Sequence, residues 1–289
     1  MTADKMQKLK DISEIVTDIP SLPVVATKIL QVIADEASSL KELIKVISLD
    51  QSFSSRLLRI ANSAFYRRDS SVTDVTDAVI RIGFTATKAF VFAASLKDIL
   101  RTSNKTDKAL WEHNMAVSIG ATIIANETAL LPSGEPLIYG LLHDIGKVVI
   151  NLNMRDRYAE VIRMVNEQSI PFNEAEYQLL GFDHCDVGDF VAKQWHLPEN
   201  LSFVIANHHR EDLLEKIKDL PLKKVILITK AADVLCSDLG IGLAHPKTLA
   251  KNEWDALKLP SQKKRDKIMQ KIEKEYPEYR NFITGQGAV

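Results

Sequence analysis

Apolar residues recur at spacings of three and four in segment after segment of this 289-residue chain. That spacing is the period of an amphipathic α-helix, and no convincing run of strict alternation, the pattern of a half-buried strand, lies between turn signals. Because 46% of the residues are hydrophobic, the chain can bury a substantial core. The sequence therefore predicts an all-α fold, large enough for one large domain or two modest ones.

Local signals place the expected helix boundaries. Ile19–Pro23 is expected to break the chain, because proline fixes its own φ and restrains the residue before it. Ser39 and Glu42 have capping-box spacing, and Gly83 suits a left-handed helix stop because it lacks a Cβ. The expected helices cover about 24–34, 39–49, 50–60, 73–82, 85–100, 107–130, a segment carrying His143 and Asp144, 155–168, 174–180, 186–195, 199–208, 222–238 and 262–276.

The polar segment 101–106 is interpreted as a hinge between two long helices. We therefore expect two helical lobes, an N-terminal lobe over residues 1–103 and a second helical lobe over residues 104–289. The second lobe would end in a charged amphipathic helix that packs on one side only, followed by a frayed tail.

Charge and cysteine content narrow the function classes. The 37 basic and 38 acidic residues nearly cancel, and no dense basic run is interleaved with aromatics, which argues against a nucleic-acid partner. No stretch reaches the roughly 18 uncharged residues of a membrane helix. With a charged start, this favours a soluble cytoplasmic protein without membrane contact. Cys185 and Cys236 lack CxxC spacing, so they are interpreted as small core residues rather than a disulfide or a thiolate zinc cluster.

Five imidazoles and two carboxylates stand out in this apolar helical pattern. His143 and Asp144 adjoin on an expected helix with apolar neighbours such as Leu142 and Ile145. An unpaired charge in such surroundings is strongly disfavoured, and a cation is the simplest partner. The candidate metal ligands are His113, His143, Asp144, His184, His208, His209 and Asp233, which leaves His196 and His245 as the ordinary histidines.

The candidate ligands divide into two groups. His113, His143, Asp144 and Asp233 can converge from three helices of a bundle and form a minimal site. His184 and the His208–His209 pair can complete a second position, so that two metals share one water. Mixed nitrogen and oxygen donors suit one or two ions of Fe, Mn, Zn, Ni or Co better than Mg or Ca.

Each of these candidate residues also has a simpler interpretation when it is taken alone. A His-Asp dipeptide can be a surface or capping pair, and His113 beside Trp111 can be a satisfied core or surface residue. His208 and His209 can form a polar helix end, where the helix dipole favours partly charged imidazole. Lys147, one turn beyond the His-Asp pair, is either a contact for a bound phosphate or a solvated surface lysine. The order and helix-scale spacing of the whole set favour metal binding.

Several sequence blocks match a known family over roughly residues 15–240. The N-terminal blocks are Leu22–Pro23, Ile47–Asp50, Leu57–Tyr66 and Asp77–Gly83, and the later ones are Trp111–His113, Gly140–Lys147, Asp183–His184, Trp195 and His208–His209. In these blocks the chain resembles the HDOD family, a branch of the HD-domain superfamily. The most specific block is Ala61–Tyr66, interpreted as a packed corner in which Asn62 hydrogen-bonds the turn.

The resemblance implies an HD-domain-like helical bundle for the second lobe. It also implies that the seven candidates match the dinuclear HD ligand pattern, with Asp144 bridging the two metals. Relatives of the HD-GYP type are metal-dependent phosphohydrolases, but this chain departs from their pattern twice. Ala109 stands where a third-metal glutamate is expected, and Arg210–Leu214 replaces a Gly-Tyr-Pro loop after His209. These departures argue against cyclic-dinucleotide hydrolysis.

The resemblance leads to three hypotheses, and the sequence leaves open whether the chain is an enzyme. Because HDOD proteins are mostly regulatory, the leading one is a bacterial-type signalling regulator. Its N-terminal lobe would bind a signalling protein, and its second lobe would sense a metal, a nucleotide or another phosphorylated ligand. The alternative is a metal-dependent phosphohydrolase or phosphodiesterase, with Asp144 and Lys147 in catalytic roles. A third is a helical scaffold with a vestigial metal site.

Overall fold

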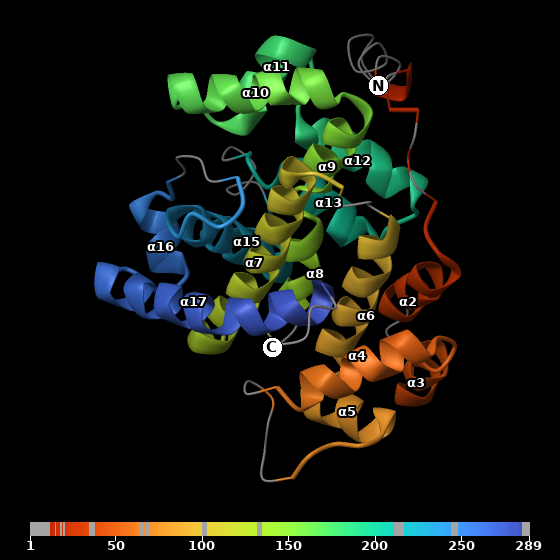
Figure 1. The fold of residues 1–289 in the computed structure, drawn as a ribbon. Coiled ribbons are helices and arrows are strands. Elements are labelled where there is room, and N and C mark those ends of the chain that lie inside the picture. The colour runs from red at the N-terminus through yellow and green to blue at the C-terminus, as the bar shows by residue number, and fades with distance from the viewer. Residues whose placement is uncertain are drawn as a thin grey trace.

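The computed structural model describes residues 12–14, 16–17, 19, 21–34, 38–63, 66, 70–99, 103–131, 135–210, 217–243 and 248–284. These residues form helices and no strand, which confirms the all-α prediction (Figure 1). The helices are α2 (Val24–Ala34), α3 (Leu40–Ile47), α4 (Gln51–Ala61), α5 (Val75–Ile82), α6 (Phe84–Ile99), α7 (Lys105–Thr128), α8 (Glu135–Leu142), α9 (Ile145–Asn153), α10 (Arg155–Gln168), α11 (Phe172–Leu180), α12 (His184–Gln194), α13 (Glu199–Asn207), α15 (Leu220–Asp238), α16 (Lys251–Ala256) and α17 (Gln262–Thr284).

Polar side chains and a glycine set the boundaries of the first helices, and the predicted capping box is confirmed. Ser39 accepts a hydrogen bond from the Glu42 amide, and the Glu42 carboxylate accepts one from the Ser39 amide, so the capping box opens α3. Asp50 caps α4 by accepting from the Ser52 amide at 2.7 Å. Gly83 ends α5 with φ at 95°, a conformation that disfavours any residue with a Cβ.

The corner after α4 is held by Asn62. Its side-chain nitrogen donates to the carbonyl oxygens of Leu58 and Val72, at 2.9 and 2.8 Å, and its oxygen accepts from the Val72 amide at 2.8 Å. The predicted role of Asn62 is therefore confirmed, and its contacts extend ten residues along the chain to the segment that leads into α5. Residues 64–65 and 67–69 of this corner lie outside the described part of the chain.

Helix α7 lies at the centre of the second half of the structure and is buried along most of its length. Helices α8, α15 and α17 pack against it, while α9 packs on α12 and α12 on α13 (Figure 1). Helices α2–α6 pack on one another in the first half, and α6 also contacts α8. The division into lobes at residues 103 and 104 stays a prediction, and α17 contacts α4 and α6 as well as α7.

Three features of the helix pattern differ from the prediction. His143 and Asp144 do not lie inside a helix, because α8 ends at Leu142 and α9 begins at Ile145. Apolar residues continue on both sides of the pair, from Leu141 and Leu142 to Ile145 and Val148, so periodicity does not reveal the break. The short helix α16 was not expected, and α17 continues past Tyr276 to residue 284. The expected frayed tail, residues 285–289, lies outside the described residues.

No single helix among the described residues combines the length and apolar character needed to cross a bilayer. Helix α5 and the Phe84–Leu96 part of α6 meet that test only as a pair, with a bend of 111° between them.

Two glycines allow the helices around the His-Asp turn to approach closely. A Cβ on Gly146 of α9 would lie 1.9 Å from the carbonyl oxygen of His184 in α12. A Cβ on Gly188 of α12 would lie 2.5 Å from the Ile205 side chain in α13. Since no side chain fits at either place, α12 lies directly against α9, and the start of α12 comes next to Asp144.

This packing predicts that Gly146→Ala destabilises the protein. The added methyl group would meet backbone, which cannot rotate away, so we expect a loss of about 1–3 kcal/mol in the free energy of unfolding. Gly120→Ala in α7 is a matched control, because its nearest new contact is the flexible end of Ile272, at 3.1 Å. Urea denaturation measures both variants, and equal stabilities would contradict the packing described here.

Candidate metal centre

The seven side chains singled out in the sequence come from five places in the fold. His113 lies on α7, His143 and Asp144 form the turn between α8 and α9, and His184 begins α12. The other three are His208 and His209, directly after α13, and Asp233 on α15. Six of the seven side chains are buried, and His209 is half-buried. The fold thus gathers residues that are up to 120 positions apart in the sequence.

The Asp144 carboxylate lies among imidazole nitrogens. Its Oδ2 is 3.3 Å from Nε2 of His143 and 3.7 Å from Nε2 of His113. Its Oδ1 is 3.3 Å from Nε2 of His184 and 3.4 Å from Nε2 of His208. The two oxygens of one carboxylate therefore face two different sets of histidines.

Backbone carbonyl groups orient two of these rings. Nδ1 of His143 lies 2.8 Å from the carbonyl oxygen of Gly140, and Nδ1 of His208 lies 3.1 Å from that of Ile205. A ring nitrogen that bonds a carbonyl oxygen must carry the hydrogen, so in a neutral ring Nε2 keeps its lone pair. Both lone pairs then face the Asp144 carboxylate, an arrangement that repels unless a positive charge lies between them.

Three buried atoms of this cluster make no hydrogen bond with the part of the chain that the structure describes. They are Nε2 of His143, Nε2 of His208 and Oδ1 of Asp144. Leaving a buried polar atom unpaired costs about 1–3 kcal/mol, and more when it is charged. Because all three are metal-donor atoms within one small region, the residues present fit a bound cation.

His113 is fixed between α15 and the segment that follows it. Its Nε2 lies 3.0 Å from Oδ1 of Asp233, and its Nδ1 lies 3.3 Å from the Ile241 carbonyl oxygen. Gly242, with φ at 81°, brings this segment so close that a Cβ there would lie 2.6 Å from the His113 Cβ. The position of His113 thus depends on a glycine that no motif in the sequence indicated.

His184 is held by Glu176 of α11, which the sequence analysis did not identify. One Glu176 oxygen, Oε2, accepts from the His184 amide at 2.8 Å and lies 2.5 Å from its Nδ1, while Oε1 accepts from the Tyr158 hydroxyl at 3.2 Å. Burial raises the pKa of Glu176 to about 8. A carboxylate behind a histidine fixes the ring and its tautomer, as in many metal sites. Nε2 of His184 is then 3.0 Å from Nε2 of His209.

Lys147 is buried, so the alternative of a solvated surface lysine is wrong. Its Nζ lies 2.6 Å from Oδ2 of Asp144 and 4.7 Å from the centre of the Phe172 ring. Burial would lower the pKa of Lys147, but the charge of Asp144 outweighs it and raises that pKa. The predicted contact of Lys147 with a phosphate stays a prediction, and in this structure its ammonium group pairs with Asp144.

The electrostatics favour the protonation states that bind metals. Burial lowers the pKa of His143, and burial with the charge of Lys147 lowers that of His184 well below its usual value. Burial opposes ionisation of Asp144, but its interactions with His143 and with the charge of Lys147 hold the pKa of Asp144 well below its usual range. Neutral imidazoles beside an ionised carboxylate are the forms that coordinate a cation.

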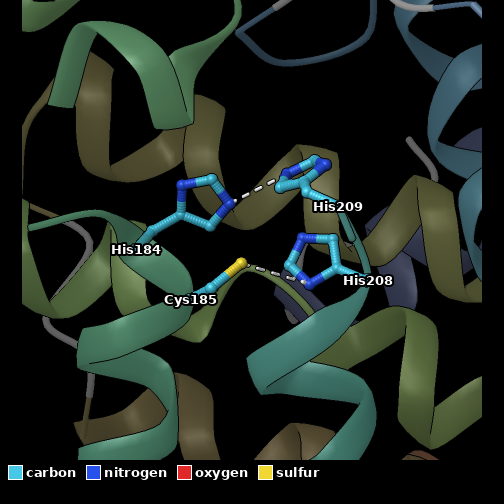
Figure 2. Close-up of side chains that lie close together, drawn as sticks. All are labelled: His184, Cys185, His208 and His209. Carbon is cyan, nitrogen blue, oxygen red and sulfur yellow. Dashed lines mark hydrogen bonds between the residues drawn. The ribbon is translucent and has the colours of Figure 1, made fainter. Parts of the chain in front are cut away.

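Among the described residues, two groups of donors are compact enough to hold a metal ion. One consists of His113, His143 and Asp144, and the other of His184, Cys185, His208 and His209. Figure 2 shows the second group, in which Sγ of Cys185 lies 3.8 Å from Nδ1 of His208. Cys185 is buried, as expected of a core residue. In the sequence, only its position directly after His184 indicates that it could also bind a metal.

Solved structures with this fold come from several bacteria. An HDOD domain protein of unknown function from Geobacter sulfurreducens is 24% identical, with 98% of this chain and 99% of that chain covered and a TM-score of 0.77. A protein from Marinobacter aquaeolei VT8, provisionally described as a signal transduction protein, is 18% identical, with 98% and 65% covered and a TM-score of 0.77. A provisionally described phosphohydrolase from Shewanella amazonensis SB2B is 22% identical, with 99% of each chain covered and a TM-score of 0.69. At these identities the similarity shows the shared fold.

Two curated relatives are themselves uncharacterised. A protein of Treponema pallidum (strain Nichols) is 26% identical over 201 residues, which are 68% of this chain and 39% of that protein. The protein YuxH of Bacillus subtilis (strain 168) is 20% identical over 143 residues, which are 47% of this chain and 35% of that protein. The chain thus spans less than half the length of either relative. The sequence profile of the HDOD domain matches residues 19–211, most of the chain, and the protein belongs to the HDOD family.

Proposed function

We propose that this chain is a regulatory signalling module whose second lobe holds one or two divalent transition-metal ions. The observation that carries the proposal is the Asp144 carboxylate, which is buried among the Nε2 atoms of His143, His184 and His208 at 3.3–3.4 Å. Nitrogen and oxygen donors together favour Fe, Mn, Zn, Ni or Co over Mg or Ca. The metal would stabilise the lobe and couple its conformation to the binding of a signalling partner or a phosphorylated ligand.

The two oxygens of Asp144 support a division into two cation positions. Oδ2 faces His113 and His143, with Asp233 behind His113, and would serve the first position. Oδ1 faces His184 and His208 and would serve the second, to which His209 also contributes. Asp144 would therefore bridge the two cations, as the family resemblance implies.

The burial of the centre favours regulation over catalysis. A catalytic metal keeps a coordination position open to substrate, whereas structural sites are closed by protein ligands. Here His113, His143, Asp144, His184 and Asp233 are each at most 3% exposed. The signal transduction description of the Marinobacter aquaeolei structure is consistent with a regulatory role.

A second candidate function is metal-dependent phosphoester hydrolysis. Two donor groups that share one carboxylate favour it, as does the provisional phosphohydrolase description of the Shewanella amazonensis structure. Two bound cations would supply an activated water and neutralise phosphate charge. Asp144 would hold both cations, Lys147 would keep that carboxylate ionised, and the half-buried His209 would lie nearest to solvent.

The metal proposal predicts that tag-free protein contains about one or two equivalents of transition metal. Elemental analysis measures this content, and the His143→Ala, Asp144→Ala double variant should lose most of it. His196→Asn is the matched control, because His196 is exposed and its φ of 53° suits asparagine. Wild-type protein that neither contains these metals nor binds them when they are added would refute the proposal.

Glu176→Gln tests whether the carboxylate behind His184 tunes the centre. Above pH 8, where Glu176 is ionised, the substitution should weaken metal binding by about 10–100-fold, because the ring of His184 loses its anionic partner. Glu174→Gln, an exposed position on the same helix, should leave the affinity unchanged. Competition with a chromophoric chelator gives both affinities, and indistinguishable variants would show that Glu176 has no such role.

Turnover separates the two candidate functions. The regulatory proposal predicts that metal-loaded wild type hydrolyses nitrophenyl phosphoesters, nucleotides and cyclic dinucleotides no faster than Asp144→Asn does. Hydrolysis by the wild type that disappears in Asp144→Asn, with folding intact by circular dichroism, would establish the enzymatic function instead.

A further inference from the structure

We propose that Cys185 joins His184, His208, His209 and Asp144 as a ligand of the second cation position, and that its thiolate makes this position select zinc. The inference rests on the proposed metal centre and adds a ligand outside the predicted set and the identity of one metal. Thiolate with imidazole is a donor set typical of tetrahedral zinc.

The first support is the arrangement of the four donors. One donor atom from each of His184, Cys185, His208 and His209 lies within 4.8 Å of every other. Figure 2 shows the Cys185 sulfur pointing toward the His208 ring, with the rings of His184 and His209 beyond it. The sulfur comes from the first turn of α12, next to His184, and both imidazoles of the pair come from the end of α13.

The donor groups lie about as close together as the ligands of a bound zinc ion. Zinc–nitrogen bonds of about 2.0–2.1 Å and a zinc–sulfur bond of about 2.3 Å place the donor atoms about 3.4–3.6 Å apart. In this structure Nε2 of His184 is 3.0 Å from Nε2 of His209, and the Cys185 sulfur is 3.8 Å from Nδ1 of His208. Nδ1 of His208 bonds the Ile205 carbonyl, so the sulfur would share the cation with Nε2 of the same ring, and side-chain rotations would bring these donors to coordination distance.

The unpaired atoms supply an independent observation. Nε2 of His208 is buried and makes no hydrogen bond with the described residues. Nδ1 of His184 faces the carboxylate of Glu176, which leaves Nε2 of a neutral His184 ring with its lone pair toward His209. The unpaired Nε2 of His208, beside the hydrogen-bonded pair of His184 and His209, indicates a cation.

Coordination also gives the buried thiol a charge balance. When Zn²⁺ binds, the sulfur–hydrogen bond breaks, a sulfur–zinc bond forms, and the proton leaves to solvent without any change of oxidation state. The first position, with His113, His143 and Asp144, has only nitrogen and oxygen donors. The two positions would therefore prefer different metals.

X-ray absorption at the zinc edge tests this ligand directly. We expect zinc-loaded full-length protein to show a sulfur shell at about 2.3 Å. Cys185→Ala should abolish the shell and weaken zinc binding by about tenfold or more. Cys236→Ala is the matched control, because Cys236 is the only other cysteine and is also buried, and it should retain both the shell and the affinity.

Bound zinc with only nitrogen and oxygen ligands, or a sulfur shell that survives in Cys185→Ala, would overturn the inference while the proposed metal centre stands. Protein that binds no zinc at all would overturn the inference. The proposed metal centre would then be tested by the binding of the other transition metals. If Cys185→Ala does not fold, the spectra of the wild type and Cys236→Ala still decide, since a shell present in both assigns the thiolate to Cys185.

Discussion

The buried charge of Asp144 is the constraint on which the rest of the site depends. A carboxylate that is 1% exposed has lost its hydration, at a cost of several kcal/mol, and must be compensated inside the protein. Lys147 provides one compensating charge at 2.6 Å. The imidazoles around it do not, because backbone carbonyls fix the rings of His143 and His208 so that their lone pairs face the carboxylate. Cations between these donors would resolve the conflict, which is why we propose a metal centre here.

The helix packing around Asp144 explains why residues so far apart in sequence meet there. The chain turns at His143 and Asp144 between α8 and α9, which places both side chains in the same small region. Gly146 then allows α12 to lie against α9, and the first residue of α12 is His184. Replacing the turn by a continuous helix would separate these side chains around the helix axis. The break is therefore part of the site and not an irregularity of the fold.

Much of the fold can be predicted from local sequence patterns. The three-to-four spacing predicts the helices, and the capping box of Ser39 and Glu42 predicts where one of them begins. The ligand candidates could be identified because imidazoles and carboxylates are rare in apolar helical surroundings. The break at residue 143 could not, because the apolar run continues across it and a helical period looks the same on both sides.

Other parts of the site depend on tertiary contacts that leave no local trace. Glu176 and Glu174 are two residues apart on one helix, yet only Glu176 is buried against His184. The spacing of Cys185 from Cys236 predicts a core residue, whereas in the structure its sulfur lies beside His208, which follows α13. The packing of α11, α12 and α13 decides which of several chemically similar residues faces the site.

Anomalous X-ray diffraction from crystals of tag-free protein tests the central claim most directly. The account predicts a metal peak at about 2.0–2.3 Å from an Asp144 oxygen and from the Nε2 atoms of the surrounding histidines. An absence of anomalous density at Asp144, with ordered waters hydrogen-bonded to His143 and His208 instead, would contradict it.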